Sequence, residues 1–257
     1  MKLLKILSHK NDELIPPVYL MCDGTRSKKE FISVGEGFTR YFVIDHARLK
    51  PYDNVLDVGC GVGQKARVLT SYLNKKGRYE GFDIISDAIE WCIKSYQKYN
   101  NFNFQFANIY NSHYNPNAIC KAIDYRFPYP DNTFDLIILS SVFTHMLPLD
   151  MKNYFEEISR VLKSGGKCVI TFFLLNPETK NLMALEKNRI KIPFEYESET
   201  CRIADKISPE KTVAHDERNV RRMFEQNGLH IIEMTYGSWS GRKEMIGSLQ
   251  DVIIAIK

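Results

Sequence analysis

One short segment of the chain restricts its possible folds more than any other. Residues 55–58 form the run Val-Leu-Asp-Val, which predicts a buried strand. Gly59, Gly61 and Gly63 follow at alternate positions, and a helical pattern begins at Gln64. Because glycine has no Cβ, it adopts positive φ at little cost and lets a ligand approach the backbone. The segment therefore predicts a strand, a tight turn and a helix whose first N–H groups suit a polar or anionic part of a cofactor.

The glycine turn is compatible with two classes of cofactor. A dinucleotide site has the pattern G-x-G-x-x-A, which the chain satisfies from Gly61 through Gly63 to Ala66. Counting from Asp57 instead gives D-x-G-x-G-x-G, which resembles motif I of the class I S-adenosylmethionine-dependent methyltransferases. We favour this second interpretation, because it begins at the end of the strand; it implies cofactor contacts from Asp57, Gly59, Cys60, Gly61 and Gly63. A turn that only connects strand and helix is the third alternative.

Length and composition fit a globular protein with one core. The chain has 257 residues, of which 44% are hydrophobic and 26% charged. This length accommodates a full sheet between two helix layers, so we expect a single α/β domain over residues 1–257. The net charge is +4 and the lysines are spread along the chain, so no nucleic-acid partner is expected.

The N-terminal residues do not have the pattern of a secretory signal peptide. The apolar run from Met1 to Leu7 is interrupted by Lys5 and followed by polar residues. No apolar segment approaches the length needed to cross a bilayer, so we expect no membrane span and a cytoplasmic protein.

The cysteines are scattered and contain no C-x-x-C pair. They are Cys22, Cys60, Cys92, Cys120, Cys168 and Cys201. We therefore expect reduced side chains that form neither a disulfide framework nor a metal site.

A second predicted strand, Tyr79 to Phe82, also ends at an acid. Asp83 follows it, and the two oxygens of one carboxylate can accept hydrogen bonds from both ribose hydroxyls of a nucleoside cofactor. Both cofactor interpretations predict this acid, so it favours a nucleoside without deciding between them. We assign Asp83 and its neighbour Ile84 to the cofactor site, and we expect Ser86 to cap the next helix.

The third predicted strand, Phe102 to Phe106, leads to Asn108 and Ile109. By resemblance to the methyltransferase pattern, Asn108 would bond the adenine amino group, and Ile109 would pack on the adenine ring. Asn108 stands where aspartate is more frequent in that pattern.

The remaining elements alternate between helices and strands, with one irregular segment. Residues 134–140 are too apolar for an exposed sheet face and predict a central parallel strand, so its exit at Ser140 faces the cofactor. Helices are also predicted at 37–49, 150–162 (ending at the turn 164–166), 178–187 and 216–227, and strands at 167–173, 229–234 and 251–256. Residues 174–216 break this rhythm and predict a lid that selects the substrate.

The resemblance to class I methyltransferases extends from about Gly35 to Lys257. Residues 157–166 are similar to the E-x-x-R-v-L-k-p-G-G segment of that family, and residues 140–147 and 172–176 resemble bacterial small-molecule methyltransferases. The resemblance implies a doubly wound, seven-stranded, mostly parallel sheet with an antiparallel last strand. We expect residues 1–36 to form an N-terminal extension and residues 174–216 to form the lid insertion after strand 5. The Ser140-Ser141-Val142-Phe143 sequence differs from the [N/D]-P-P-[Y/F] segment of adenine amino methyltransferases, which disfavours nucleobase methylation.

His145 is the candidate catalytic residue. Methyl transfer to a hydroxyl requires a base, and an imidazole with an ordinary pKa of about 6.5 suits that task. His145 lies just beyond the exit of the fourth strand. The alternative is a histidine at a helix start that packs locally, and His113 and His215 are second choices.

Three classes of function remain open on the sequence alone. The first is an S-adenosylmethionine-dependent methyltransferase acting on a small hydroxylated metabolite, sugar or glycolipid, probed by transfer from a labelled donor. The second is a nicotinamide-dependent oxidoreductase, which predicts NADH binding. The third is a protein that binds S-adenosylmethionine but does not transfer its methyl group.

Overall fold

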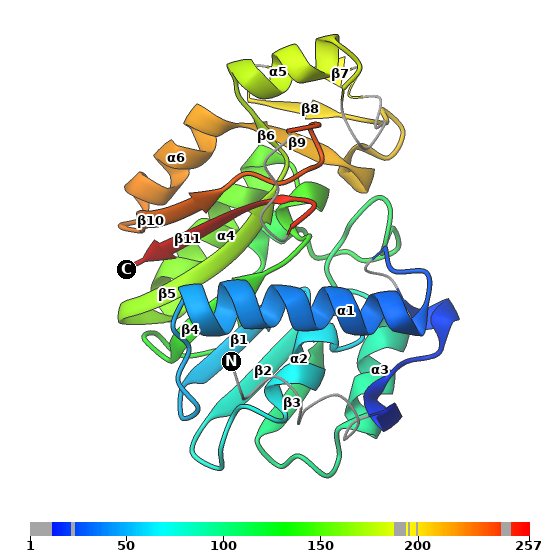
Figure 1. The fold of residues 1–257 in the computed structure, drawn as a ribbon, viewed down its shortest axis with the longest axis vertical. Helices are drawn as coiled ribbons and strands as arrows, with labels where there is room; N and C mark the ends of the chain where they lie inside the picture. Colours follow the sequence, from blue (N-terminus) through cyan, green and yellow to red (C-terminus); the bar gives the residue numbers. More distant parts are fainter. Residues whose placement is uncertain (1–11, 22–23, 188–193, 195, 199, 243–247) are drawn as a thin grey trace. The chain divides into compact units, whose positions relative to one another are not determined.

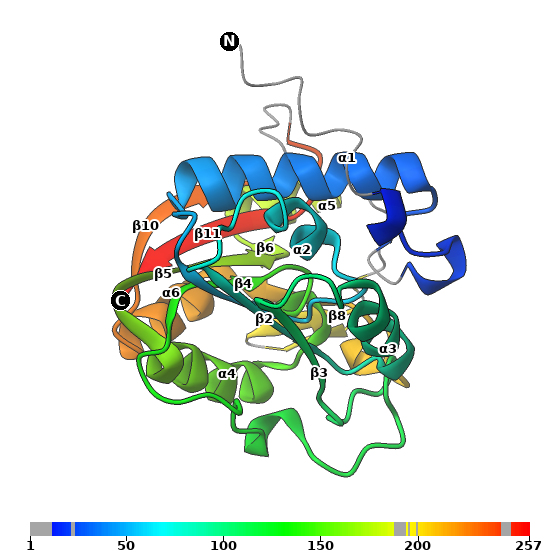
Figure 2. The ribbon, with the colours of Figure 1, turned by 90° about the horizontal axis from the view of Figure 1, so that it is seen from below.

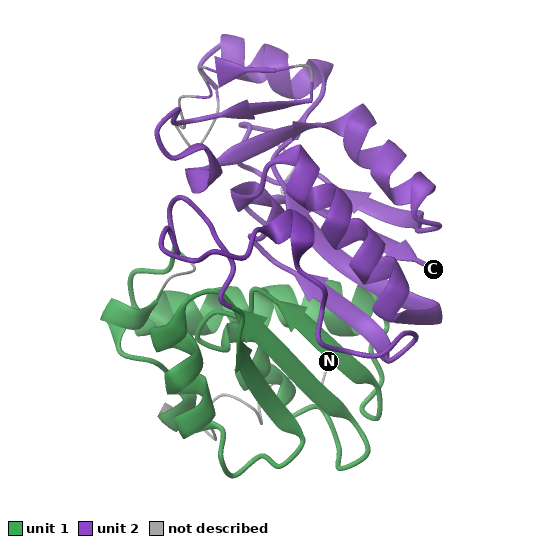
Figure 3. Ribbon diagram, turned by 180° about the vertical axis from the view of Figure 1, so that it is seen from behind, with its two compact units in different colours: residues 1–107 green, residues 108–257 purple. Residues whose placement is uncertain are grey.

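The computed structural model, drawn in Figure 1, describes residues 12–21, 24–187, 194, 196–198, 200–242 and 248–257. The N-terminal run from Met1 to Leu7 lies outside the described residues. The chain divides into two compact units, residues 1–107 and 108–257, which Figure 3 colours separately. Each unit is described by itself below, and the single domain expected over residues 1–257 stays a prediction.

Unit 1 contains the first three strands of the main sheet. Its elements are η1 (Asp12–Leu14), η2 (Val18–Leu20), α1 (Lys28–Phe38), η3 (Thr39–His46), β1 (Asn54–Val58), α2 (Gln64–Leu69), β2 (Arg78–Asp83), α3 (Ser86–Ser95) and β3 (Phe102–Phe106). The strands are parallel, with Asp57 of β1 opposite Gly81 of β2. Figure 2 shows α1 and α2 on the same side of these strands. Parallel pairing brings the carboxyl ends of β1 and β2 to one edge, where ligands bind in doubly wound sheets.

Two local predictions in unit 1 were wrong. The helix expected at residues 37–49 begins earlier, at Lys28, because Ser27 accepts a hydrogen bond from the backbone N–H of Glu30 and caps it. It then continues as the wider π-helical segment η3 and ends at His46. Ser86 is not a cap but the first residue of α3, whose preceding residue makes no side-chain cap bond.

Unit 2 contains the other four strands of the main sheet and a smaller sheet. Its elements are η4 (Ala122–Asp124), β4 (Phe134–Leu139), η5 (Phe143–His145), α4 (Pro148–Val161), β5 (Leu162–Phe172), β6 (Leu174–Leu175), α5 (Pro177–Ala184), β7 (Tyr196–Glu197), β8 (Cys201–Ile203), η6 (Pro209–Lys211), β9 (Val213–Asp216), α6 (Glu217–Gln226), β10 (His230–Thr235) and β11 (Asp251–Ile256). β4 and β5 are parallel, and β11 is antiparallel to both β5 and β10. The apolar side chains of β4 are buried, as the apolar sequence of residues 134–140 predicts.

The strand order of the main sheet is β10-β11-β5-β4-β1-β2-β3. This confirms the predicted α/β fold with seven strands, mostly parallel and with an antiparallel last strand. One boundary differs: residues 164–166 do not end α4 in a separate turn but lie within β5. The reason is a partner distant in sequence, since the N–H of Gly165 donates to the carbonyl of Lys257 and the N–H of Lys257 donates to Gly166.

The segment 174–216 is not structureless. It contributes α5 and a four-stranded sheet in the order β6-β9-β8-β7. A cluster of apolar side chains packs beside this sheet: Phe173, Leu175, Phe194, Ala214 and Trp239. The carboxylate of Asp251 connects the small sheet to the main one, because it accepts hydrogen bonds from Leu174 N, Gly237 N and Trp239 Nε1 at 2.7–2.8 Å. A role of this segment as a lid stays a prediction.

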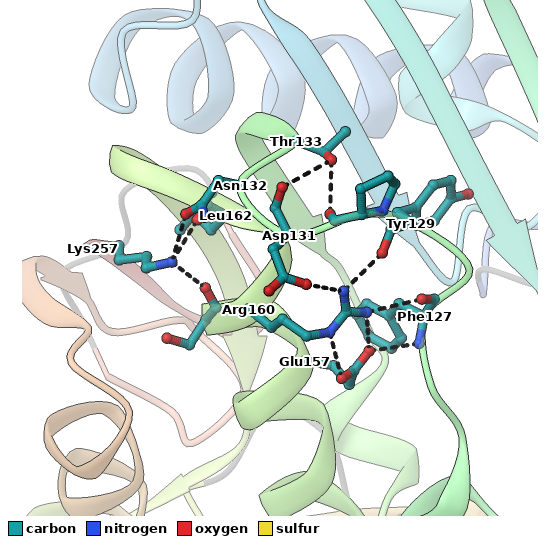
Figure 4. Close-up of polar contacts among 11 residues, drawn as sticks. Phe127, Tyr129, Asp131, Asn132, Thr133, Glu157, Arg160, Leu162 and Lys257 are labelled. Atoms are coloured by element: carbon teal, nitrogen blue, oxygen red, sulfur yellow. Dashed lines mark hydrogen bonds and ion pairs between the residues drawn. The ribbon is translucent and has the colours of Figure 1, made fainter.

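Arg160 of α4 fixes the loop that precedes β4, as Figure 4 shows. Its guanidinium donates to both carboxylate oxygens of Glu157 and to the carbonyl oxygens of Phe127 and Tyr129. A further bond of 2.8 Å joins it to Asp131. These contacts explain the E-x-x-R spacing of residues 157–160, because positions three apart lie on the same face of a helix. The carboxylate of Glu157 also accepts from the N–H of Phe127 at 2.7 Å. The Glu157–Arg160 ion pair therefore satisfies three backbone groups, the N–H and carbonyl of Phe127 and the carbonyl of Tyr129.

Five of the cysteines belong to the described residues, and none of these five forms a disulfide. Within the described ranges, no helix combines the length and apolar character that crossing a membrane requires.

Candidate functional site

The glycine turn of unit 1 has the backbone conformation that its sequence predicts. Gly59, Gly61 and Gly63 all have positive φ, at 71°, 52° and 75°. At Gly63 a Cβ would stand 2.9 Å from the hydroxyl oxygen of Tyr96, which itself donates to the carbonyl of Gly63 at 2.9 Å. A side chain at Gly63 is therefore excluded both by conformation and by space.

Asp57 lies at the end of β1 and is completely buried. Its Oδ2 accepts a hydrogen bond of 2.8 Å from the hydroxyl of Tyr79, whereas its Oδ1 is buried with no hydrogen-bond partner in the structure. Burial raises the pKa of Asp57 to about 6, and the charge of Lys65 and the Tyr79 hydroxyl oppose this rise. A buried carboxylate oxygen without a donor is a candidate to receive one from a ligand.

Asp83 connects β2 to the glycine turn. Its Oδ2 accepts from the N–H of Gly61 at 2.7 Å, and its Oδ1 accepts from the N–H of Ile85 at 3.0 Å. Burial raises the pKa of this carboxyl, and the backbone N–H donors partly offset the effect. The backbone N–H of Ile84 is a third donor to this carboxylate, which has about four lone-pair sites, so Asp83 can still accept from a ribose hydroxyl. The adjacent Ile84 is half-buried. The structure therefore brings Asp57, Asp83 and the three glycines together.

The sequence did not indicate two further residues of this turn. Tyr79 is fully buried and supplies the hydrogen bond to Asp57, a contact that depends on the register of β1 against β2, which the sequence does not show. Lys65 of α2 is only 5% exposed. No pattern in the sequence indicated its burial, because a lysine in a helix usually lies in solvent. Cys60 is buried, and its thiol contacts the carbonyl of Gly61 at 3.8 Å, so its contact with the cofactor stays a prediction.

Asn108 and Ile109, the proposed adenine contacts, belong to unit 2 and differ in exposure. Asn108 is exposed, and its Oδ1 accepts a hydrogen bond of 3.1 Å from Asn115. Ile109 is 2% exposed. A polar, accessible amide next to an apolar side chain agrees with the chemistry expected for an adenine, although the contact itself stays a prediction.

The exit of β4 carries a polar network that the sequence did not indicate. Ser140 is half-buried, and the next residue, Ser141, has a φ of 61°, which is unusual for a residue with a Cβ. Ser141 donates from its N–H to Thr171 Oγ1 at 2.8 Å and from its hydroxyl to Gln250 Oε1 at 3.1 Å. These two bonds hold the strained backbone at the end of the strand.

His145 lies in the short turn η5, before α4, and is half-buried. Its Nδ1 lies 3.2 Å from the carbonyl oxygen of Glu210, and its backbone carbonyl accepts from Asn111 at 3.0 Å. A carbonyl oxygen can only accept, so Nδ1 carries the hydrogen and the lone pair of the neutral ring is on Nε2. Burial lowers the pKa of His145 below its usual value of 6.5, and the contact with Glu210 partly opposes this. At neutral pH the imidazole is therefore an unprotonated, oriented acceptor.

The other histidines are less suited to act as a base. His215 lies in β9, and the following residue, Asp216, caps α6. It is fully buried, and its Nε2 lies 2.7 Å from the carbonyl of Phe143. Burial lowers its pKa to about 4. His113 is exposed and stacks edge-on against Tyr114.

Comparison with curated proteins gives relatives that share part of their length with this chain. A sterol 24-C-methyltransferase of Gibberella zeae is 28% identical over 170 residues, 63% of this chain and 40% of that protein. Phosphoethanolamine N-methyltransferase 3 of Arabidopsis thaliana is 29% identical over 150 residues, 58% of this chain and 27% of that protein. A ubiquinone/menaquinone biosynthesis C-methyltransferase of Wigglesworthia glossinidia brevipalpis is 28% identical over 123 residues, 48% of this chain and 44% of that protein. The chain thus spans less than half the length of these relatives.

Solved structures with the same fold cover nearly the whole chain. A protein from Pyrococcus horikoshii OT3 superposes with a TM-score of 0.58 at 18% identity, covering 97% of this chain and 99% of that one. A structure described as a SAM-dependent methyltransferase from Methanosarcina mazei has a TM-score of 0.57 at 22% identity and covers 84% of this chain and 97% of that one. These similarities establish the fold.

The family assignment comes from a sequence profile. The family described as "Methyltransferase domain" matches residues 49–228, which include β1, the glycine turn, the E-x-x-R segment and α6. The strand order, the positive φ values of the glycine turn and this match agree with one another, and none of the comparisons described above points to nicotinamide chemistry. The chain therefore belongs to the methyltransferase domain family and has the class I methyltransferase fold.

Proposed function

We propose that this protein is an S-adenosylmethionine-dependent methyltransferase that methylates a hydroxyl group of a small molecule, such as a hydroxylated metabolite, a sugar or a glycolipid. The cofactor would supply a methyl group already activated by a positive sulfonium and would become S-adenosylhomocysteine. The relatives named above are C- and N-methyltransferases of small molecules, which supports methyl transfer to a small molecule. The choice of a hydroxyl rests on His145.

The residues of the glycine turn fit such a cofactor. Gly59, Gly61 and Gly63 leave the backbone accessible, and Asp83 can still accept from a ribose hydroxyl. No donor among the described residues bonds the buried Oδ1 of Asp57, and an amino group of the cofactor would supply one. Cys60, Ile84, Asn108, Ile109 and Ser140 complete the proposed set of cofactor contacts. No cluster of metal-ligating side chains occurs among the residues that the structure covers, and the proposal involves no metal.

The observation that carries the proposal is the orientation of the His145 ring. Because Nδ1–H donates to the carbonyl of Glu210, Nε2 is the atom that can take a proton. The cofactor would supply the methyl group to a hydroxyl oxygen of the acceptor, and Nε2 of His145 would accept the proton that this oxygen loses. An amine that is already neutral has less need of such a base.

The test is transfer of a labelled methyl group by His145→Ala, with His230→Ala as the matched control. His230 lies on β10 and is exposed, so its removal tests for a non-specific effect of losing a histidine. We expect His145→Ala to lower kcat by about 10²-fold or more, as loss of a general base does, while the Kd for S-adenosylhomocysteine stays unchanged. Turnover equal to that of His230→Ala would contradict the proposal.

The pH dependence gives an independent check. His145 is active in its neutral form, so kcat/KM should rise with pH along an acid limb and then level off. Because burial lowers the pKa of His145, the midpoint of this limb should lie below 6.5. When the measurement is made with the cofactor saturating, so that the titration of Asp57 in the free site does not contribute, the limb should disappear in His145→Ala.

The acceptor class is found by a screen with labelled S-adenosylmethionine. The acceptors should be matched in size and differ in the reacting group: phenols and sugar hydroxyls, primary amines, and quinols methylated on carbon. We expect label in the hydroxylated group. Label in the amines or on the quinol ring, with none on oxygen, would overturn the hydroxyl assignment while leaving the methyltransferase activity intact.

A further inference from the structure

Two histidine rings connect the same two segments of unit 2. The segments are the turn η5 and the stretch from η6 to β9. The ring of His145 in η5 faces the carbonyl oxygen of Glu210 in η6, with Nδ1 at 3.2 Å. In the opposite direction, the ring of His215 in β9 faces the carbonyl oxygen of Phe143 in η5, with Nε2 at 2.7 Å. A carbonyl oxygen can only accept, so each imidazole donates a hydrogen bond to the other segment.

The two hydrogen bonds differ in how much displacement they tolerate. The distance of 2.7 Å between His215 Nε2 and the carbonyl oxygen of Phe143 is at the short end of the range for N–H···O bonds. The distance of 3.2 Å between His145 Nδ1 and the carbonyl oxygen of Glu210 is at the long end. A small shift of η5 away from η6 would therefore break the bond that orients His145. The bond of His215 opposes such a shift.

Both partners of the shorter bond have fixed positions. β9 lies between β6 and β8 in the small sheet, and the N–H of His215 donates to the carbonyl of Phe173 at 2.8 Å. The side chains of His215 and Phe143 are fully buried. The ring of Phe143 packs on those of Phe155 and Phe172, with centroids 5.2 and 5.4 Å apart. The bond between them therefore fixes the place of η5 relative to the small sheet.

Packing alone does not explain a histidine at position 215. Its Nδ1 is buried with no hydrogen-bond partner among the described residues. A buried polar atom without a partner costs free energy that an apolar side chain would avoid. The carbonyl of Phe143 also accepts from the N–H of Met146, but at 3.4 Å, within the turn itself. The specific contribution of the His215 ring is thus its short bond to η5.

We propose that His215 is a positioning residue that acts through His145. Its bond to Phe143 holds η5 where the Nδ1–H of His145 reaches the carbonyl of Glu210, so that Nε2 of His145 stays unprotonated and available. Functional side chains depend on such supporting hydrogen bonds for their orientation. This inference rests on the proposed function, because it takes His145 as the base.

The test compares two amides that differ by one methylene group. In His215→Gln the amide nitrogen is the same number of bonds from Cα as Nε2 of histidine, so the donor to Phe143 is kept. In His215→Asn the side chain is too short to reach this carbonyl. Val220→Ala, which removes buried volume from α6, is the control for lost stability. Thermal unfolding would establish that each variant is folded at the temperature of the assays.

The first readout is the tautomer of His145, measured on the full chain by nitrogen-15 NMR of the imidazole rings. The signals of His145 are those that disappear in His145→Ala. We expect the Nδ1–H tautomer in the wild type, His215→Gln and Val220→Ala, and a mixture of both tautomers in His215→Asn, because an unheld neutral ring carries its hydrogen on either nitrogen. A pure Nδ1–H tautomer in folded His215→Asn would overturn the proposal. So would its loss in folded His215→Gln, a result that decides the matter even if His215→Asn does not fold.

The second readout is methyl transfer from labelled S-adenosylmethionine to an acceptor found in the screen above. We expect His215→Asn to lower kcat by about 10- to 100-fold, because a misplaced catalytic group loses its alignment with the reacting atoms. The Kd for S-adenosylhomocysteine should stay within about twofold, and His215→Gln should restore kcat to within about threefold of the wild type. Equal kcat values for His215→Asn and His215→Gln would contradict a role of the Nε2–H bond.

A double variant shows whether His215 acts through His145. In a His145→Ala background, His215→Asn should change kcat by less than about twofold, because there is no base left to position. A further loss as large as in the wild-type background would show that His215 acts independently of His145. The two readouts also separate the two proposals: a wild-type protein without methyl transfer refutes the proposed function, whereas the tautomer alone decides whether His215 positions the ring.

Discussion

At the scale of single residues, the buried carboxylate of Asp57 lowers the stability of the folded protein when it is ionised. Asp57 is fully buried, and its pKa is raised to about 6 from the ordinary value of 3.8. The folded protein therefore binds this proton more tightly than the unfolded chain does, and the free energy of unfolding falls as the pH rises from about 4 to about 6. Above that range the loss is complete. We interpret it as the cost of an ionised oxygen kept for the cofactor.

This interpretation predicts that Asp57→Asn stabilises the protein in the absence of ligand. Asn does not titrate, and its carbonyl oxygen can still accept from Tyr79. The pH-dependent stability difference between Asp57→Asn and the wild type should be about 1 kcal/mol at pH 4.5 and reach about 3 kcal/mol at pH 7.5, since one pKa unit corresponds to about 1.4 kcal/mol. Chemical unfolding at the two pH values measures it. A difference that does not change with pH would contradict the raised pKa.

At the scale of elements, α4 and the loop before β4 depend on one ion pair. The Arg160 side chain is 17% exposed and that of Glu157 is 11% exposed, and together they bond the backbone of Phe127 and Tyr129. Arg160→Met would leave a largely buried carboxylate and two carbonyl oxygens without their donor, so we expect a loss of about 3 kcal/mol. Arg160→Lys should recover only part of it, because lysine lacks the planar fork.

Thermal unfolding of these variants provides the measurement, with Arg222→Met as the control. Arg222 is exposed on α6, and we expect its replacement to change stability by less than about 0.5 kcal/mol. Equal stability of Arg160→Met and Arg222→Met would show that the network of Figure 4 does not hold the loop.

The elements also show where the sequence was sufficient. The glycine turn was predictable because its requirements are local: a strand, three positions without Cβ and an acid at the strand end. The position of Gly165 was not, because this residue pairs with Lys257 at the other end of the chain. The true start of α1 was missed because its cap, Ser27, lies in a stretch without an apolar period, and the π-helical segment that follows does not keep the 3.6-residue repeat.

At the scale of the whole molecule, the fold and the family followed from the order of motifs along the chain. Asp57, Asp83 and the glycines could be named as site candidates from the sequence, because their chemistry depends on residue type and spacing. The burial of Lys65 and the contact of His145 with the carbonyl of Glu210 could not be predicted, because they depend on long-range packing. The acceptor remains the subject of the screen described above, since the comparisons name relatives that methylate carbon and nitrogen.

The central claim is that the glycine turn binds the nucleoside of S-adenosylmethionine. Calorimetric titration of the wild-type protein with S-adenosylhomocysteine and, separately, with NADH tests it most directly. The account predicts saturable heat with S-adenosylhomocysteine and none with NADH. Saturation by NADH without any heat from S-adenosylhomocysteine would contradict it.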